Sequence, residues 1–440
     1  MKTYDLIVIG FGKGGKTLAK FAATQGKKVA MIEQSPRMYG GTCINIGCIP
    51  SKTLVHEGLA HSGFKQAMQR KEEVIDALNN KNYHNLADEE NITVFDNKAK
   101  FQSNDTVALL NDNGSIEETV TAENIVINTG ATPVILPIDG IKESQYLYDS
   151  TGIMNLPEQP QRLVIVGGGY IALEFASIFA NFGTEVTVLE HKSELLAHED
   201  REVVAQVEQD LTDKGVTFVY NAETTAFEDQ DDHTLVRTSQ GDFAAEAVLL
   251  ATGRKPNTDL ELDNTDIKLG ERQEIAVNDK LQTTVPHIYA LGDVKGGMQF
   301  TYISLDDFRI VRDQLLGNGQ RTTNNRGAVP YTMFVDPPFS RVGLTAAEAE
   351  EQGYDFAEGQ MAVNAMPRHK INHDERGLFK VVIDKSNNQI LGATLYGAQT
   401  EEIINIIKLA IDQQITYDVL RDNIYTHPTM IESFNDLFNI

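Results

Sequence analysis

A unit of about 30 residues occurs twice in this 440-residue chain and constrains its fold more than any other feature. The first copy is YDLIVIGFGKGGKTLAKFAATQGKKVAMIEQ, and the second is QRLVIVGGGYIALEFASIFANFGTEVTVLEH. Each is a short apolar run, a glycine-rich turn, a helical pattern and a second apolar run that ends in an acid. The small residues and the acid are Gly10, Gly12, Gly15 and Glu33 in the first copy and Gly167, Gly169, Ala172 and Glu190 in the second.

In both copies the acid follows the first glycine by 23 residues. Glycines at this spacing let backbone N–H groups approach a pyrophosphate at a helix N-terminus, and the acid can accept hydrogen bonds from ribose hydroxyls. A single motif of this kind is weak evidence, but two copies with matched acids predict an α/β protein with two Rossmann-like dinucleotide-binding domains. Glu190 would repel a 2′-phosphate, which favours NADH over NADPH, and His191 and Lys192 weaken that preference.

Other segments predict where the domains meet. LPEQPQR, residues 156–162, reads as a linker into the second nucleotide domain. INTGATP and LATGRKPN are strand-to-turn segments of similar design, and IYALGDV is a strand that ends in Gly-Asp. Further on, GLFKVVIDKSNNQILGATLYG predicts a β-hairpin and EEIINIIKLAIDQQ a helix with an isoleucine-rich face. This last region lacks nucleotide motifs, so we expect a packing or dimerisation domain.

The stretch GGTCINIGCIPSK holds Cys43 and Cys48, which are the only cysteines in the chain. Residues five apart in a regular helix rise about 7.5 Å, whereas a disulfide needs Cα atoms within about 7 Å. The two cysteines can therefore bond only across an irregular backbone, for which Gly47 is suited. Pro50 suits the first turn of a following helix, SKTLVHEGLAH, and a thiol near that N-terminus would have a lowered pKa.

Four interpretations of the pair were compared: a structural disulfide, a zinc site, two inert buried thiols and a redox pair. Zinc would need further ligands, and His56 and His61 lie further along the helix without a second cysteine pair. A permanent disulfide is disfavoured because the chain reads as cytoplasmic. Its start, MKTYDLIVIGFGKGG, is typical of a strand and turn rather than a signal peptide. We favour the redox pair.

The formal net charge of −25 disfavours nucleic acid and anionic membranes as partners. The most membrane-like window, LVIVGGGYIALEFASIFANFG, is interrupted by three glycines and by Glu174. Neither nucleic acid nor a membrane is therefore expected as a partner, and the expected partner is a small-molecule or metal-ion electron acceptor.

GGTCINIGCIPSK resembles the active-site signature of the class I pyridine nucleotide–disulfide oxidoreductases, which include dihydrolipoamide dehydrogenase, glutathione reductase and mercuric reductase. The resemblance covers the whole chain, through both glycine fingerprints, ATGRKPN, IYALGDV and the closing HPTMIE. It implies FAD and NADH as cofactors. It also implies an FAD-binding domain over residues 1–146 and 273–326, an NAD-binding domain over 147–272 and an α+β C-terminal dimerisation domain over 327–440.

The resemblance implies a role for each matching residue. Cys43 would be the interchange thiol that meets the acceptor, Cys48 the charge-transfer thiolate at the flavin, and Lys52 would lie at the flavin paired with Glu174. The other implied positions are Gly10, Gly12, Gly15, Glu33 (ribose), Gly41, Thr42, Thr129, Gly130, Gly292 and Asp293 (ribityl chain) for FAD, and Gly167, Gly169, Tyr170 (a lid), Ile171, Glu190 and Gly253 for NAD.

His427 and Glu432 match the family's C-terminal His-Pro-x-x-x-Glu motif. In the family, this histidine is the acid and base for thiol–disulfide exchange and reaches the cysteines of the other subunit. A histidine that titrates near neutral pH suits that role. The resemblance therefore implies a homodimer in which His427 completes the partner subunit's site.

Three stretches depart from the dihydrolipoamide dehydrogenase pattern: MQFTYISLDDFRIVRDQLLGNG, NKNYHNLAD and ESFNDLFNI. They are similar to the reactive-chlorine resistance flavoproteins of the same family, which are described as NADH-dependent reductases of copper(II) that protect bacteria against hypochlorous acid. The chain lacks the C-terminal cysteine pair of mercuric reductases. Copper(II) is therefore the expected acceptor, and soft thiolates favour copper(I).

Two other functions were retained beside copper reduction. A small-molecule disulfide reductase is favoured by His427, because a metal ion needs no protonated leaving thiol. A flavin-bound redox sensor is disfavoured by the intact Lys52, Glu174 and Tyr170. No resident metal site is expected, and His56, His61 and His84 are more simply read as residues on helix faces than as copper ligands.

Overall fold

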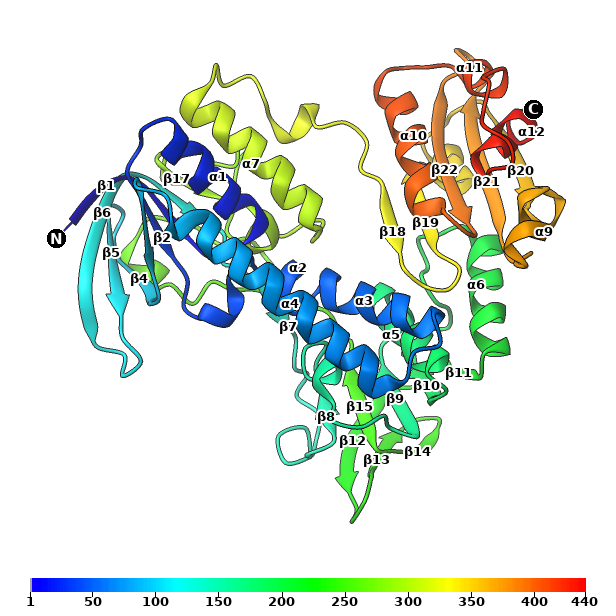
Figure 1. The fold of residues 1–440 in the computed structure, drawn as a ribbon, viewed down its shortest axis with the longest axis horizontal. Coiled ribbons are helices and arrows are strands. Elements are labelled where there is room, and N and C mark those ends of the chain that lie inside the picture. The colour runs from blue at the N-terminus through cyan, green and yellow to red at the C-terminus, as the bar shows by residue number, and fades with distance from the viewer. Residues whose placement is uncertain (1) are drawn as a thin grey trace.

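The computed structural model describes residues 2–440, and its first layer is a seven-stranded sheet (Figure 1). Five parallel strands run in the order β3-β2-β1-β6-β17, and β5 and β4 extend the sheet antiparallel beside the first half of β6. These strands are β1 (Lys2–Ile9), β2 (Val29–Ile32), β3 (Ile92–Phe95), β4 (Lys98–Ser103), β5 (Thr106–Leu110), β6 (Ile116–Ile127) and β17 (Ile288–Ala290).

The second copy of the repeated unit builds a second, all-parallel sheet in the order β11-β10-β9-β15-β8. Its strands are β8 (Leu147–Tyr148), β9 (Arg162–Val166), β10 (Glu185–Leu189), β11 (Val216–Val219) and β15 (Ala247–Leu250). A three-stranded antiparallel sheet follows β11, formed by β12 (Thr224–Asp229), β13 (Thr234–Thr238) and β14 (Gly241–Ala245). The expected linker therefore ends where β9 begins.

The C-terminal region is a five-stranded antiparallel sheet in the order β18-β19-β22-β21-β20. The strands are β18 (Tyr331–Met333), β19 (Phe339–Gly343), β20 (Phe356–Ala362), β21 (Leu378–Asp384) and β22 (Ile390–Tyr396). The expected hairpin is β21–β22, and the expected helix is α10 (Thr400–Asp412), which buries Ile403, Ile404 and Ile407 on this sheet. Both local predictions are confirmed.

Helices cover the sheets and connect them. The α-helices are α1 (Lys13–Thr24), α2 (Thr42–Asn45), α3 (Cys48–Leu59), α4 (Phe64–Ala87), α5 (Tyr170–Asn181), α6 (Arg201–Asp213), α7 (Thr301–Leu316), α8 (Ala346–Glu351), α9 (Arg368–Asn372), α10, α11 (Tyr417–Arg421) and α12 (Phe434–Leu437). Short 3-10 turns lie at Pro36–Met38, Ile153–Asn155, Leu262–Asn264, Gly292–Lys295, Thr323–Asn325, Val363–Ala365 and Ile431–Ser433. No helix within residues 2–440 is long and apolar enough to cross a membrane.

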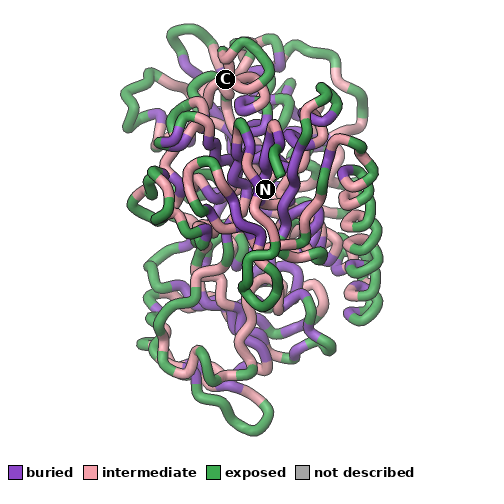
Figure 2. The backbone as a smooth tube through the Cα atoms, turned by 90° about the vertical axis from the view of Figure 1, so that its left-hand side faces the viewer, coloured by how far each residue is buried: buried purple, intermediate pink, exposed green. Residues whose placement is uncertain are grey.

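Buried residues concentrate along the strands inside the molecule, and exposed residues follow the loops (Figure 2). The helices after the cysteines belong to two cores, because Leu54 and Phe64 pack with the second sheet and Leu86 packs with the first. Conversely, Leu260 and Ile267 fall within the predicted NAD-binding range but pack in the core of the first sheet. The strand β16 (Arg254–Pro256) starts this return by pairing with β7 (Ala131–Pro133). The domain bounds drawn at 146/147 and 272/273 thus stay a prediction.

Candidate functional site

The first glycine turn is held between two strands and the acid at the end of β2. Gly10 has φ +100°, and a Cβ there would lie 2.3 Å from the carbonyl oxygen of Asn128, so only glycine fits. The carboxylate of Glu33 accepts hydrogen bonds from the N–H groups of Phe11 (3.0 Å) and Ser35 (3.2 Å). Burial raises the pKa of Glu33, and these backbone donors oppose that shift.

The second glycine turn repeats this geometry. Gly167 has φ +108°, and a Cβ there would lie 2.6 Å from the carbonyl oxygen of Ala251. Glu190 accepts hydrogen bonds from the N–H groups of Gly168 (2.8 Å) and Lys192 (2.8 Å), which correspond to Phe11 and Ser35 in the first copy. In both copies each carboxylate oxygen keeps acceptor capacity for a further donor, such as a ribose hydroxyl.

Asn128 joins three of the glycine segments and was missed by the sequence analysis. Its side-chain Oδ1 accepts from the N–H of Gly15 (2.9 Å), and its Nδ2 donates to the carbonyl oxygen of Leu291 (2.8 Å). Cβ atoms at Gly12 or Gly292 would overlap the same amide, at 2.6 Å and 2.7 Å. An amide carries both donors and acceptors, so this one buried residue binds strands β6 and β17 to the N-terminus of α1.

The Gly-Asp segment after β17 rests on a buried carboxylate. Asp307 is fully buried, accepts from the N–H of Gly292 (2.9 Å) and forms an ion pair with Arg326 (2.6 Å). Burial raises the pKa of the neighbouring Asp293, and the positive charges of Arg254 and Lys295 oppose the shift. Asp307 belongs to the stretch that departs from the dehydrogenase pattern, so this stretch supports the segment that carries the predicted ribityl-binding residue.

The two strand-to-turn segments INTGATP and LATGRKPN carry three predicted site residues, Thr129, Gly130 and Gly253. Thr129 Oγ1 donates to the carbonyl oxygen of Asn257 (2.7 Å), and Asn257 N–H donates to the carbonyl oxygen of Gly130 (2.9 Å). A Cβ at Gly130 would meet only Thr42 Oγ1, at 3.9 Å. One at Gly253 would meet nothing within 4 Å. The glycines thus border open space beside the turns.

The backbone between the cysteines is irregular, as predicted. Helix α2 ends at Asn45 and α3 begins at Cys48, with Gly47 at φ −132° and ψ −113° before it. The helix starts three residues earlier than expected, so Cys48 is its first residue and Pro50 lies within its first turn. Gly41, at φ +80°, seats this loop on the glycine turn, because a Cβ there would lie 2.6 Å from the Cα of Gly12.

The two thiols have different environments. Both are free, and Cys48 Sγ lies 3.6 Å from the hydroxyl of Thr301 at the start of α7. The hydrogen bond from Cys43 and the charge of Lys52 lower the pKa of Cys48 to about 6, against the effect of burial. The same hydrogen bond, with burial, raises the pKa of Cys43. The shared proton therefore rests on Cys43, and Cys48 is the thiolate at neutral pH.

Lys52 is fixed where the three parts of the chain meet. Its Nζ lies 2.6 Å from Glu174 Oε2 on α5 and 4.8 Å from the ring centre of Phe334. The N–H of Phe334 donates to the other oxygen of Glu174 (2.8 Å). The predicted ion pair is thus present, and the C-terminal region helps to hold it.

Tyr170 is held by a buried carboxylate that the sequence did not indicate. The hydroxyl of Tyr170 hydrogen-bonds Glu199, which also accepts from Tyr331 (2.7 Å) and pairs with Arg341 (3.1 Å). Glu199 is only 7% exposed. Ile171, next to Tyr170 at the start of α5, is 36% exposed. Tyr170 is therefore held by a network that joins the second nucleotide domain to the C-terminal region.

His427 and Glu432 pair as predicted, in the segment just before α12. His427 Nδ1 is 2.7 Å from Glu432 Oε2, and the imidazole side chain is 72% exposed. Figure 1 shows α12 at the outer end of the C-terminal domain, apart from α2 and α3. The carboxylate holds one ring nitrogen, and Nε2 has no hydrogen bond to any of residues 2–440.

Two family models match the chain. One is described as pyridine nucleotide-disulphide oxidoreductase and matches residues 4–307, and the other is the dimerisation domain of these proteins and matches residues 329–438. The chain belongs to the pyridine nucleotide-disulphide oxidoreductase family. The predicted fold class and enzyme class are confirmed.

Relatives in this family cover the chain from end to end. It is 48% identical over 441 residues to "Probable pyridine nucleotide-disulfide oxidoreductase RclA" of Escherichia coli (strain K12), with all of both chains covered. It is 33% identical to a mercuric reductase of Staphylococcus aureus, covering 98% of this chain and 81% of that protein. It also matches the solved structure of a Cu(II) complex of the HOCl-induced flavoprotein disulfide reductase RclA from Escherichia coli, with a TM-score of 0.97, 48% identity and coverage of 100% and 99%.

Family membership implies binding of FAD and a pyridine nucleotide, and the residues fit both groups. Glu33 and Glu190 keep acceptor capacity, and Gly169 and Gly253 border open space.

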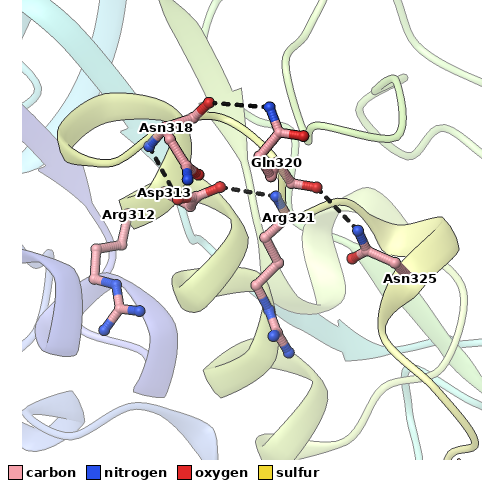
Figure 3. A pocket seen from close by; sticks show the side chains of 6 residues that line it. All are labelled: Arg312, Asp313, Asn318, Gln320, Arg321 and Asn325. Atoms are coloured by element: carbon pink, nitrogen blue, oxygen red, sulfur yellow. Dashed lines mark hydrogen bonds between the residues drawn. The ribbon is translucent and has the colours of Figure 1, made fainter.

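A polar pocket of about 470 Å³ at the far end of α7 contains none of the predicted site residues (Figure 3). Asp313 there accepts from the N–H groups of Asn318 and Arg321, so its loop is internally satisfied. Within residues 2–440, no group of three or more His, Cys, Asp or Glu side chains could hold a metal ion.

Proposed function

We propose that this oxidoreductase passes electrons from NADH, through FAD and the Cys43–Cys48 pair, to copper(II) in defence against reactive chlorine. The observation that carries the proposal is the asymmetric thiol pair, with a stabilised thiolate at Cys48 beside the Lys52–Glu174 ion pair. The end-to-end similarity to a protein solved as a Cu(II) complex and named as HOCl-induced supports the choice of acceptor.

In this proposal the chain binds its cofactors through the two glycine turns, Glu33 and Glu190. FAD, when bound, supplies the chemistry that connects a hydride donor to a disulfide. The protein keeps Cys48 anionic through Lys52 and the hydrogen bond from Cys43. Oxidation of the pair, with a thiol at Cys43 and a thiolate at Cys48, to the disulfide releases two electrons and one proton. Two copper(II) ions can take up these electrons and become copper(I).

The His427–Glu432 pair favours a second candidate, a small-molecule disulfide reductase. A histidine oriented by a carboxylate can protonate a leaving thiolate, whereas a metal ion needs no such proton. Either function would use a homodimer in which His427 reaches the cysteine pair of the partner subunit. Large apolar side chains of the C-terminal region are exposed in the single chain, including Leu409 (55%) and Ile424 (94%), as a dimer interface requires.

A comparison of acceptors tests the proposal. Anaerobic NADH oxidation is followed with copper(II), oxidised glutathione and lipoamide, and copper(I) is trapped with a chelator to give a second readout. We expect copper(II) to be reduced at least about tenfold faster than either disulfide, a difference of about 1.4 kcal/mol. The Cys43→Ser variant provides the background rate. Fast turnover of a disulfide without copper reduction would favour the second candidate.

Replacement of Glu190 tests the preference for NADH. Glu190→Gln removes the negative charge that would repel a 2′-phosphate, and we expect the NADH/NADPH ratio of kcat/KM to fall by about tenfold. The exposed Glu185 at the start of the same strand gives a matched control, because Glu185→Gln removes an equal charge away from the turn. An unchanged ratio in Glu190→Gln would show that another residue selects the nucleotide.

A further inference from the structure

Lys16 lies between the first glycine turn and the cysteine loop. It belongs to α1, and its Nζ donates to the carbonyl oxygen of Gly40 (3.4 Å) and to the side-chain oxygen of Asn82 on α4. Gly40 is three residues before Cys43, and the next residue, Gly41, rests on the turn itself. One ammonium group therefore ties α1, α4 and the start of the cysteine loop together.

The charge of Lys16 is not neutralised by a carboxylate. Among residues 2–440, no Asp or Glu oxygen lies within 4.0 Å of its Nζ, whereas Lys20, one turn further along α1, pairs with Glu89. Burial and the charge of Lys13 lower the pKa of Lys16 to about 8, and Cys43 opposes the shift. A half-buried cation with only neutral acceptors is unfavourable, and such groups concentrate at functional sites.

Helix α4 contacts both Lys16 and the cysteine loop through asparagine side chains. Asn82 Nδ2 donates to its own helix at Leu78 (2.7 Å), which leaves its oxygen for Lys16. One turn away, Asn79 donates to the side chain of Asn45 (2.9 Å), which in turn donates to the carbonyl oxygen of Gly41 (2.9 Å). Asn82 lies in NKNYHNLAD, the stretch that departs from the dehydrogenase pattern, and this contact gives the departure a structural role.

We propose that Lys16 is a positioning residue of the redox centre, which fixes the Gly40–Gly41 turn and favours the thiolate form of Cys43 from within the same subunit. The inference rests on the proposed function of Cys43 as the thiol that meets the acceptor. The charge of Lys16 opposes the rise in the pKa of Cys43, and the charge of Lys52 helps to lower the pKa of Cys48. Four further titratable groups act on this cluster: Lys13 on Lys16, and Glu174, Arg254 and Tyr302 on Cys48.

Alkylation of the two-electron-reduced holoenzyme tests the proposal. Iodoacetamide labelling of Cys43 is measured by peptide mass spectrometry from pH 5.5 to 9.5 for the parent enzyme, Lys16→Met, Lys16→Arg and Lys20→Met. In Lys16→Met we expect the apparent pKa of Cys43 to rise by about one unit and labelling at pH 7.5 to slow by about 3- to 10-fold. Lys16→Arg keeps the charge and is expected to follow the parent. Lys20→Met removes the same charge one turn away and is expected to do likewise.

The outcomes separate the inference from the proposed function. An unshifted profile in Lys16→Met, or an equal shift in Lys20→Met, overturns the role of Lys16 alone. Loss of FAD from Lys16→Met with an unshifted profile in the remaining holoenzyme also overturns it, because the charge would then serve the cofactor. A parent enzyme whose reduced Cys43 resists labelling at every pH overturns the proposed function, and the inference with it.

Discussion

Replacement of Cys48 by serine is expected to lower turnover with every acceptor by about a thousandfold or more while FAD stays bound. The thiolate is the reactive form of the pair, and a serine hydroxyl would remain protonated at neutral pH. The glycine turns, Glu33 and Asn128 are untouched by the change, so cofactor binding should persist. Stopped-flow absorbance and FAD content measure the two effects separately.

The same variant tests whether the absorbance of the reduced enzyme follows the pKa of Cys48. A thiolate beside FAD gives long-wavelength absorbance, and in the reduced parent enzyme this band should be present above about pH 6 and lost as the pH falls through that value. The sign follows from the lowered pKa of Cys48, because protonation removes the anion. Cys48→Ser should lack the band at every pH, whereas Cys43→Ser should keep it and still lose turnover. A band that survives in Cys48→Ser would assign the inner sulfur to Cys43.

Gly41→Ala is expected to release FAD and to destabilise the holoenzyme by about 3 kcal/mol or more. Two effects combine, since φ is +80° and the new Cβ would lie 2.6 Å from the Cα of Gly12. The overlap involves backbone on both sides, so neither group can rotate away. The cysteine loop would have to move off the glycine turn that is expected to bind the cofactor.

Gly26→Ala separates strain from overlap. Gly26 has nearly the same φ, +79°, but a Cβ there meets nothing within 4 Å. Its substitution should cost only the left-handed strain of about 1–2 kcal/mol and leave FAD content unchanged. Thermal release of FAD fluorescence compares the two variants. Equal shifts in both would show that the contact between Gly41 and Gly12 has no effect of its own.

Features set by local spacing could be predicted from the sequence. The matched distances to Glu33 and Glu190 predicted two related units, and the structure extends the match to their backbone hydrogen bonds. The five-residue spacing of the cysteines required a break, and the chain breaks between Asn45 and Cys48. Each of these conclusions needed only residues close together in the chain.

Residues whose partners are distant in the chain were not found. Asn128 reaches Gly15 and Leu291, and Glu199 reaches Tyr331 and Arg341, across separations of 113 to 163 residues. A lone Asn in a turn or a lone Glu before a helix carries no local signal of such a partner. The return of Leu260 to the first core was missed for the same reason, since its position depends on the pairing of β16 with β7.

The position of Glu174 makes the acidity of Cys48 depend on how the domains are placed relative to one another. One oxygen of this carboxylate faces Lys52 beside the cysteines, and the other accepts from the backbone of Phe334 in the C-terminal region. A small rotation between these parts would loosen Glu174, change the charge balance around Lys52 and so change the acidity of Cys48. The assembled protein, rather than any single domain, therefore sets how readily the pair gives up electrons.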